Sequence, residues 1–184
     1  RLTEEAWPPL VKQVINDIKL RLQVHGKVLE WEIAPNLPAV AVDRVSIYEV
    51  LINLIDNAIK YSQSSQRILI KVRQTNDGMV ETTVQDFGVG IPENVIPHLF
   101  EKFHRNHRNR AQIGGTGLGL YLSKAIVTAH GGNIWVTSHE GEGATFGFTL
   151  QPYEMLAEEL KASNNQGIER TAHGWIKNHS MYRK

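Results

Sequence analysis

Cysteine is absent from this 184-residue chain, which excludes disulfide frameworks, thiolate nucleophiles and cysteine-based zinc sites. Long apolar runs are also missing, because the best candidate, Val50 to Ile59, is interrupted by Asn53, Asp56 and Asn57 and falls short of the roughly 20 residues of a membrane span. The first residues do not have the pattern of a signal peptide, so we expect none at this point of the sequence. Neither sign of charge dominates, since 20 Lys+Arg against 19 Asp+Glu leave a formal net charge of +1. We therefore expect no nucleic acid and no membrane among the contacts of this fragment.

The composition that remains is ordinary for a globular protein with a real core, at 41% hydrophobic residues and 15 glycines. The length allows one domain plus a tail, at roughly 150 residues per domain. We expect residues 1–7 to be the end of an upstream linker, residues 8–151 to form the domain, and residues 152–184 to be a tail with a short helix to Lys161 and then flexible sequence. Because residue 1 is arginine and not methionine, we expect the chain to be a piece of something longer.

The spacing of apolar residues predicts an α+β protein. Asp43 is placed to cap the second predicted helix, and the Asp77-Gly78 pair predicts a hairpin. The order of elements favours a two-layer α/β sandwich, with a mixed and largely antiparallel sheet and helices on one face. The predicted helices cover residues 8–25, 44–61 and 118–130; the predicted strands cover residues 28–33, 67–74, 79–85, 133–138 and 144–150.

A polar stripe follows the helix predicted over residues 44–61. With Asn53 at zero on a wheel of 100° per residue, Asn57 lies at about 40° and Lys60 at about −20°. The opposite half is apolar and includes Val45, whereas Val50 is the one apolar residue on the polar side. A solvated face of an amphipathic helix explains such a stripe. Asparagine is nonetheless a poor helix former, and its amide oxygen would suit a Mg²⁺ ion already neutralised by a nucleotide.

Two glycine-rich segments flank a long polar loop. The segment 86–92 follows an apolar strand, so Asp86 is placed either to accept a hydrogen bond from an exocyclic amine or simply to form a tight turn. The segment 114–120 opens a helix, where free backbone N–H groups and the hydroxyl of Thr116 could hold phosphate. It lacks the lysine of a Walker loop and the flanking parallel strands of a dinucleotide fingerprint.

Four segments resemble, in order and spacing, the N, G1, F and G2 boxes of sensor histidine kinases; they are residues 53–61, 86–90, 99–103 and 115–120. Residues 130–136 and 141–146 also look like that family's closing hairpin. The resemblance covers about residues 8 to 151. It implies the Bergerat-type ATP-binding sandwich shared with gyrase, the Hsp90 chaperones and the mismatch-repair MutL proteins.

The same resemblance implies ATP and Mg²⁺ as cofactors. Asn57 would be the metal ligand, Asn53 and Lys60 would lie near the phosphates, and Tyr61 beside the nucleoside. Asp86 would accept from the adenine amine. The remaining residues implied in cofactor binding are Gly88, Gly90, Ile91, Gly115, Thr116, Gly117, Leu118, Gly119 and Leu120.

A mobile lid over ATP is implied within residues 87–115. By analogy Phe100 and Phe103 would anchor its base and meet partner helices, although both are equally well explained as core residues. The arginines of the loop are candidates for transient phosphate contacts or, more simply, for a solvated basic surface; they are Arg105, Arg108 and Arg110.

The implied activity is that of the ATP-binding catalytic domain of a two-component sensor histidine kinase. Such an enzyme transfers the γ-phosphoryl of Mg-ATP to a histidine on a dimerisation and phosphoacceptor helical domain, for relay to an aspartate of a response regulator. No Ser/Thr-His-Glu/Asp hairpin precedes Leu10, so we expect no catalytic residue here beyond those that position ATP and Mg²⁺.

The eight histidines lie outside the acceptor context, and His130, just before Gly131, is interpreted as serving a helix terminus. The alternatives are a nucleotide-binding sensor or scaffold without phosphotransfer, or a serine kinase of related fold. A domain that uses ATP belongs in the cytoplasm, whether its parent kinase is membrane-anchored or not.

Overall fold

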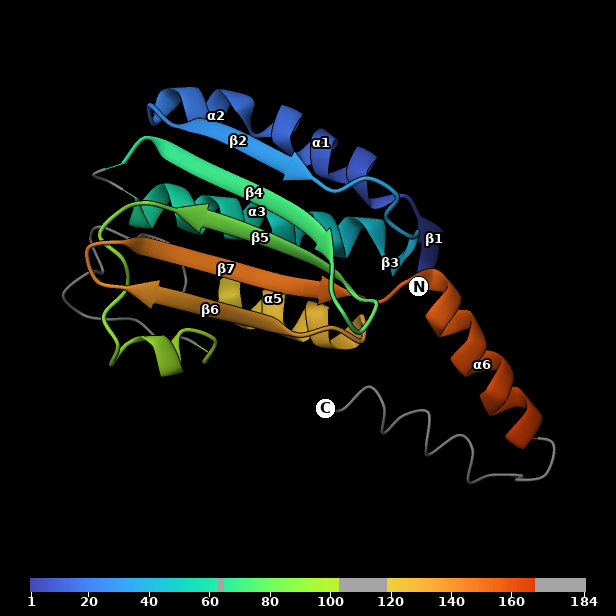
Figure 1. Ribbon diagram of the computed structural model, residues 1–184. Helices are drawn as coiled ribbons and strands as arrows, with labels where there is room; N and C mark the ends of the chain where they lie inside the picture. The colour runs from blue at the N-terminus through green and yellow to red at the C-terminus, as the bar shows by residue number, and fades with distance from the viewer. Residues whose placement is uncertain (63–64, 103–118, 168–184) are drawn as a thin grey trace.

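The computed structural model describes residues 1–62, 65–102 and 119–167, which form a sheet with helices packed on one of its faces (Figure 1). The helices are α1 (Trp7–Asp17), α2 (Lys19–Val24), α3 (Arg44–Tyr61), the short 3₁₀ helix η1 (Ile96–His98), α5 (Gly119–Ala129) and α6 (Tyr153–Gly167). The strands are β1 (Thr3–Glu5), β2 (Val28–Ile33), β3 (Val40–Val42), β4 (Arg67–Gln74), β5 (Val80–Asp86), β6 (Ile134–His139) and β7 (Gly143–Leu150).

The main sheet has the strand order β2-β4-β5-β7-β6. Only β2 runs parallel to its neighbour β4, and the other pairs are antiparallel. The predicted turn joins β4 to β5, with Gly78 at φ 88°, a conformation that glycine adopts without strain. The mixed, largely antiparallel sheet and the helices on one face confirm the predicted fold class.

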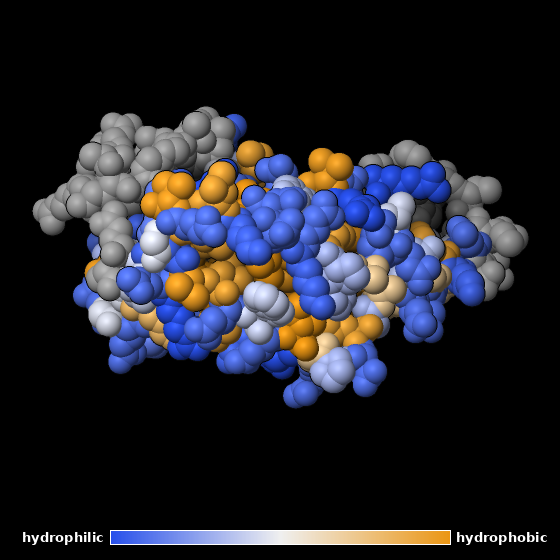
Figure 2. All heavy atoms as spheres, turned by 90° about the horizontal axis from the view of Figure 1, so that it is seen from above, coloured by the Kyte–Doolittle hydropathy of each residue, from blue (hydrophilic) through white to orange (hydrophobic). Residues whose placement is uncertain are grey.

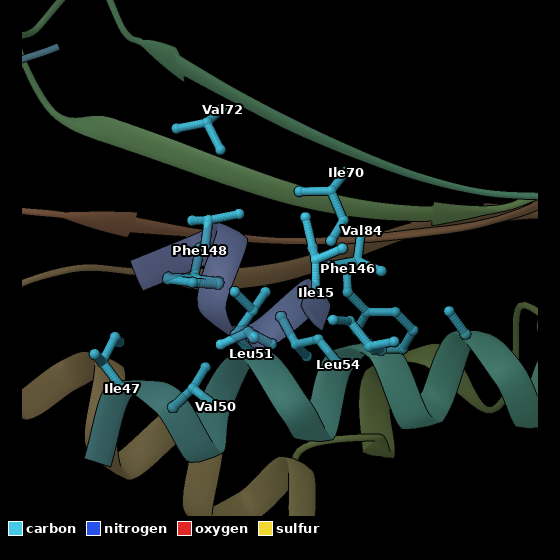
Figure 3. Close-up of a cluster of buried hydrophobic side chains, with 14 of the residues drawn as sticks. Ile15, Ile47, Val50, Leu51, Leu54, Ile70, Val72, Val84, Phe146 and Phe148 are labelled. Atoms are coloured by element: carbon cyan, nitrogen blue, oxygen red, sulfur yellow. The ribbon is translucent and has the colours of Figure 1, made fainter. Parts of the chain in front are cut away.

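The core lies between the sheet and α3 (Figure 3). Leu51 and Leu54 of α3 point toward Val84, Phe146 and Phe148 of the strands, and all five side chains are fully buried. Burying a side chain of this size stabilises the fold by about 1.5–3 kcal/mol. This packing holds α3 in a fixed position against the sheet. The polar groups at the ends of α3 and β5 are therefore fixed relative to each other.

Trp7 closes this core from the side of α1. Its ring meets Phe148 edge-on with centroids 6.1 Å apart, and its Nε1 donates to Oγ1 of Thr82 at 2.8 Å. Both polar partners are buried, so the hydrogen bond removes the cost of placing an indole N–H inside the protein.

The buried arc of α3 is rotated relative to the prediction. Val50 is fully buried although the wheel places it on the polar side, and Val45 is 77% exposed although the wheel groups it with the apolar half. The cause is α5, which packs along α3 and which a wheel of one helix cannot include. With Asn53 at zero, the buried arc therefore runs from about 60° to about 240°.

Several boundaries differ from the predicted ones. The helix expected over residues 8–25 begins at Trp7 and is divided at Ile18, whose ψ of −1° ends α1 before α2 begins. The helix after Pro152 extends past the expected end at Lys161 to Gly167, because the weak helix propensity of the following polar residues does not by itself stop a helix. Leu118, the expected start of a helix, lies outside the described residues, and α5 is described from Gly119.

The segments expected to flank the domain make defined contacts. Residues 3–5 form β1, which pairs antiparallel with β3, Thr3 lying opposite Val42. Pro152 forms a bridge to Val40, and Gln151 donates to Glu159 of α6 at 3.1 Å. The division into linker, domain and tail remains a prediction.

One side of the molecule exposes large apolar residues. Leu20 and Val24 of α2 and Val28 and Trp31 of β2 are all at least half exposed. Figure 2 looks onto the side where α1, α2 and β2 lie in Figure 1, and hydrophobic areas interrupt the hydrophilic surface there. Across residues 1–62, 65–102 and 119–167, no helix is both long and apolar enough to cross a membrane.

Candidate nucleotide site

Asp86, the last residue of β5, is a buried carboxylate with one engaged and one unengaged oxygen. Its side chain is 1% exposed, and Oδ1 accepts from the backbone N–H groups of Gly88 at 3.0 Å and Ala144 at 3.3 Å. Oδ2 has no partner. Burial raises the pKa of Asp86, against the opposing effects of the two N–H bonds and of Lys27. Oδ2 is therefore a buried acceptor that no donor of the described residues satisfies.

The structure shows the tight turn that was one of the two explanations for the glycine segment, and it leaves the other one open. The bond from Gly88 N–H to Asp86 makes the carboxylate a turn former, while its other oxygen stays available. A Cβ on Gly88 would lie 2.6 Å from Ser62 Cα, and one on Gly90, at φ 76°, would lie 2.4 Å from the carbonyl oxygen of His139. The glycines thus allow the loop to lie directly on protein backbone.

The turn between β6 and β7 supports this loop from the other side. Ile91, which is 1% exposed, donates its N–H to Ser138 Oγ at 2.7 Å, and the same hydroxyl donates to the carbonyl of Gly143 at 3.0 Å. Gly141 donates to the carbonyl of Val89 at 2.7 Å. The sequence did not point to Ser138, because a serine on an exposed-looking strand carries no signal of a partner 47 residues away.

The polar stripe of α3 lies at the border with α5, so it is not simply a solvated face. Asn53 Nδ2 donates to Ser123 Oγ of α5 at 3.4 Å, and a Cβ on Gly119 would lie 3.9 Å from Asn53 Cγ. Asn57 and Lys60 are half-buried. The first residue of α5 therefore lies next to Asn53, at the border between the two helices.

Tyr61 and Lys27 complete the side of the site near Asp86. Burial and the charge of Asp86 raise the pKa of Tyr61. Lys27 Nζ donates to the carbonyl oxygens of Ser62 and Ser65, and burial lowers its pKa. Sequence reasoning missed Lys27 and Ser62, because a lysine before a strand and a serine after a helix are common on surfaces.

His130 fixes α3 to α5 at the opposite end of the two helices. Asp43 N–H donates to His130 Nε2 at 3.0 Å, so Nδ1 carries the proton and donates to the carbonyl of Ile126 at 2.7 Å. Burial lowers the pKa of His130. Asp43 also caps α3 by accepting from Ser46 N–H at 3.1 Å, as predicted. The expected role of His130 at a helix terminus is confirmed.

The other predicted residues divide into described and undescribed ones. Leu120 of α5 and Phe100 pack against the hydrophobic core, which is one of the two explanations given for Phe100. Gly119 begins α5 beside Asn53. The rest lie outside the described residues: Phe103, Arg105, Arg108, Arg110, Gly115, Thr116, Gly117 and Leu118.

Metal binding by the described side chains alone is unsupported, since within residues 1–62, 65–102 and 119–167 no group of three His, Asp or Glu side chains could hold an ion. The candidate donors on α3 are the amide oxygens of Asn53 and Asn57, which are hard but neutral ligands. Such a set fits Mg²⁺ that arrives with phosphate oxygens and keeps several waters.

A separate polar cleft of about 670 Å³ lies beside the β6–β7 turn. Its lining residues are Glu93, Asn94, Ser138, His139 and Glu140. Two carboxylates in the lining would repel a triphosphate, and no residue of α3 or α5 contributes to it. This cleft is therefore unsuited to an anionic ligand.

The sequence matches the family described as "Histidine kinase-, DNA gyrase B-, and HSP90-like ATPase" over residues 42–154. Among curated proteins, it is 41% identical over 155 residues to the adaptive-response sensory kinase SasA of Synechococcus sp. (strain JA-2-3B'a(2-13)), which covers 84% of this chain and 41% of that kinase. It is 39% identical over 134 residues to the sensor histidine kinase WalK of Bacillus subtilis (strain 168), which covers 70% of this chain and 22% of WalK. The chain thus spans less than half of the length of these relatives.

Solved structures of similar fold include those of ThkA and ShkA. The catalytic domain of histidine kinase ThkA in a nucleotide-free form aligns with a TM-score of 0.70 and 28% identity over 83% of this chain and 96% of that domain. Full-length ShkA in complex with AMPPNP aligns with a TM-score of 0.71 and 26% identity over 81% of this chain and 30% of ShkA.

Proposed function

Because this chain belongs to the family of histidine kinase-, DNA gyrase B- and HSP90-like ATPases, we propose that it is the ATP-binding catalytic domain of a two-component sensor histidine kinase. The observation that carries the proposal is Asp86, whose Oδ1 is held by two backbone N–H groups while none of the residues that the structure describes binds the buried Oδ2. An acceptor-only group at the end of a strand suits the exocyclic amine of adenine. Gly88 and Gly90 hold the loop beside it.

The phosphate end of the proposed site lies between α3 and α5. Asn53 contacts Ser123 of α5, Asn57 and Lys60 would lie near the same phosphates, and the backbone N–H groups of Gly117 to Leu120 would hold the β- and γ-phosphates. Asn57 would be the protein ligand of Mg²⁺, which supplies charge neutralisation to the phosphates when bound. Tyr61 would lie beside the nucleoside. Residues 87–115 would include the lid, with Phe103 at its base and Arg105, Arg108 and Arg110 as transient phosphate contacts.

The proposed reaction transfers the γ-phosphoryl of ATP to a histidine on a dimerisation and phosphoacceptor helical domain, for relay to an aspartate of a response regulator. SasA and WalK are named as kinases, and more than half of each lies outside the part matched by this chain. This domain would contribute position and electrostatics, without a nucleophile or general base of its own. Its place of work would be the cytoplasm, where ATP is available.

Binding of AMPPNP to this chain, measured by calorimetry with and without Mg²⁺, tests the nucleotide site. Wild-type protein should bind more tightly with the metal, and Asn57→Ala should lose most of that difference because its amide oxygen is the one proposed ligand. Asn16→Ala, at an exposed asparagine of α1, is the matched control. An affinity that depends on neither Mg²⁺ nor Asn57 would rule out the proposed metal ligand.

The chemistry is tested separately with labelled ATP and the full-length protein that contains this domain. Acid-labile, base-stable phosphate on the protein is expected of a phosphohistidine. Base-labile, acid-stable phosphate would indicate a serine kinase of related fold instead. Tight nucleotide binding with no protein phosphorylation would indicate a sensor or scaffold.

A further inference from the structure

Two buried side-chain atoms have no hydrogen-bond partner among the residues that the structure describes: Asp86 Oδ2 and Ser62 Oγ. Ser62 is fully buried, as is Asp86 to within 1%. An unsatisfied buried hydroxyl is costly, and native proteins keep few of them. Asp86 Oδ2 is already assigned to the proposed nucleotide site. Ser62 Oγ is therefore the buried atom for which a partner has still to be identified.

The two atoms belong to the same end of the site. Gly88 connects them, because its N–H donates to Asp86 Oδ1 at 3.0 Å and its Cα lies so close to Ser62 that a Cβ would be 2.6 Å from Ser62 Cα. The same added Cβ would lie 2.7 Å from the carbonyl oxygen of Tyr61. The C-terminal end of α3 and the end of β5 therefore meet at this glycine.

Every polar group of Ser62 other than its hydroxyl is engaged. Its N–H donates to the carbonyl of Ala58 at 3.1 Å, which closes the last turn of α3. Its carbonyl accepts from the ammonium group of Lys27, which also holds the carbonyl of Ser65. Since the backbone of Ser62 is fixed by α3 on one side and by Lys27 on the other, the hydroxyl stays in place without a partner of its own.

We propose that the Ser62 hydroxyl is a second base-recognising group, which donates a hydrogen bond to N1 of adenine, directly or through one water, while Asp86 accepts from the adenine amine. The proposal rests on the nucleotide-binding function proposed above. Adenine presents a donor amine next to the acceptor N1, and a carboxylate can read only the donor. A hydroxyl supplies the missing donor. Guanine presents a carbonyl and an N–H on the same edge, so its carbonyl would face the Asp86 carboxylate.

Ser62→Ala tests the proposal on this chain by calorimetry with ATP and with 1-deaza-ATP, which lacks the N1 acceptor. Loss of one neutral hydrogen bond should weaken ATP binding by about 3- to 10-fold. The same substitution should leave the affinity for 1-deaza-ATP unchanged. The melting temperature of the free protein should stay the same or rise, because removing an unpartnered hydroxyl costs little.

Ser65→Ala is the control variant, since Ser65 lies on the same loop and its carbonyl also binds Lys27. It should bind both nucleotides like the wild type. Wild-type affinity of Ser62→Ala for ATP, or an equal loss with both nucleotides, would overturn the role of Ser62 and leave the nucleotide site standing. A wild-type chain that binds no adenine nucleotide would instead refute the proposed function itself.

Discussion

Replacing Asp86 by asparagine should separate ligand recognition from folding. The substitution keeps the size of the side chain, and the amide oxygen can still accept from Gly88 and Ala144 at the position of Oδ1. The change falls on the unpartnered Oδ2, where an NH₂ group would then face the adenine amine. Two donors facing each other cannot bond, so the contact is lost.

The expected loss of affinity follows from the charge of that contact. A hydrogen bond to a charged group contributes about 1.5–3 kcal/mol, which corresponds to a roughly 10- to 150-fold increase in the Kd for AMPPNP. The stability of the free protein should change in the opposite direction. Burial is the largest influence on the pKa of Asp86 and raises it, so it outweighs the N–H bonds and Lys27, and the ionised carboxylate costs folding free energy at neutral pH.

The stability of the free protein should depend on pH through Asp86. Because the folded pKa of Asp86 is raised above its unfolded value of 3.8, its contribution to stability is present below pH 3.8 and is lost as the pH rises through the folded pKa. Asp86→Asn should therefore melt at a higher temperature than wild type at pH 7.5, and this advantage should shrink as the pH is lowered toward 4.

Calorimetry with AMPPNP and thermal melts of the free protein at both pH values measure the two effects. Asp77→Asn, at an exposed carboxylate in the turn between β4 and β5, is the control and should bind AMPPNP like the wild type. Unchanged affinity of Asp86→Asn would refute the assignment of the base contact. A lower melting temperature at pH 7.5 would refute the argument that burial of the charge opposes folding.

Two further substitutions test the supports of the site. His130→Phe should lower the free energy of unfolding at pH 7.5 by about 1–3 kcal/mol, because Asp43 N–H is left without its acceptor; chemical denaturation measures this. Since the pKa of His130 is lowered from 6.5, wild-type stability should fall as the pH drops below about 6.5, and a pH dependence that survives in His130→Phe would contradict the assignment. Ser138→Ala should weaken AMPPNP binding by loosening the loop at Ile91 while leaving the Mg²⁺ dependence intact; loss of the Mg²⁺ dependence instead would show that the effect is not local to the base.

The fold was largely predictable because strands and helices have strong apolar periods. The five strands of the main sheet lie within a residue or two of their predicted ends, and Asp43 caps α3 as its residue type predicts. The short strand β1 was not predicted, since three residues show no alternation and β1 exists only through pairing with β3. Val45 and Val50 were placed wrongly because the packing of α5 against α3 is a tertiary fact.

The candidate site was predictable only where a residue type is unusual for its position. An asparagine pair inside a helix and an aspartate between a strand and glycines stand out in the sequence. Lys27, Ser62 and Ser138 do not, because their contacts are with backbone groups brought close by the fold. A residue type that is unusual for its position leaves a local signal, whereas a common residue type that is placed by the fold leaves none.

The glycine loop after Asp86 packs on the β6–β7 turn, so mutations in the two segments should have similar effects. A Cβ on Gly143 would lie 2.2 Å from the carbonyl oxygen of Asp86, although the two residues are far apart along the chain. Alleles at Gly143 or Ser138 should therefore share the phenotype of alleles at Asp86 in a screen for lost nucleotide binding. A map of such alleles on the linear sequence would show two separate clusters that are one place in the folded protein.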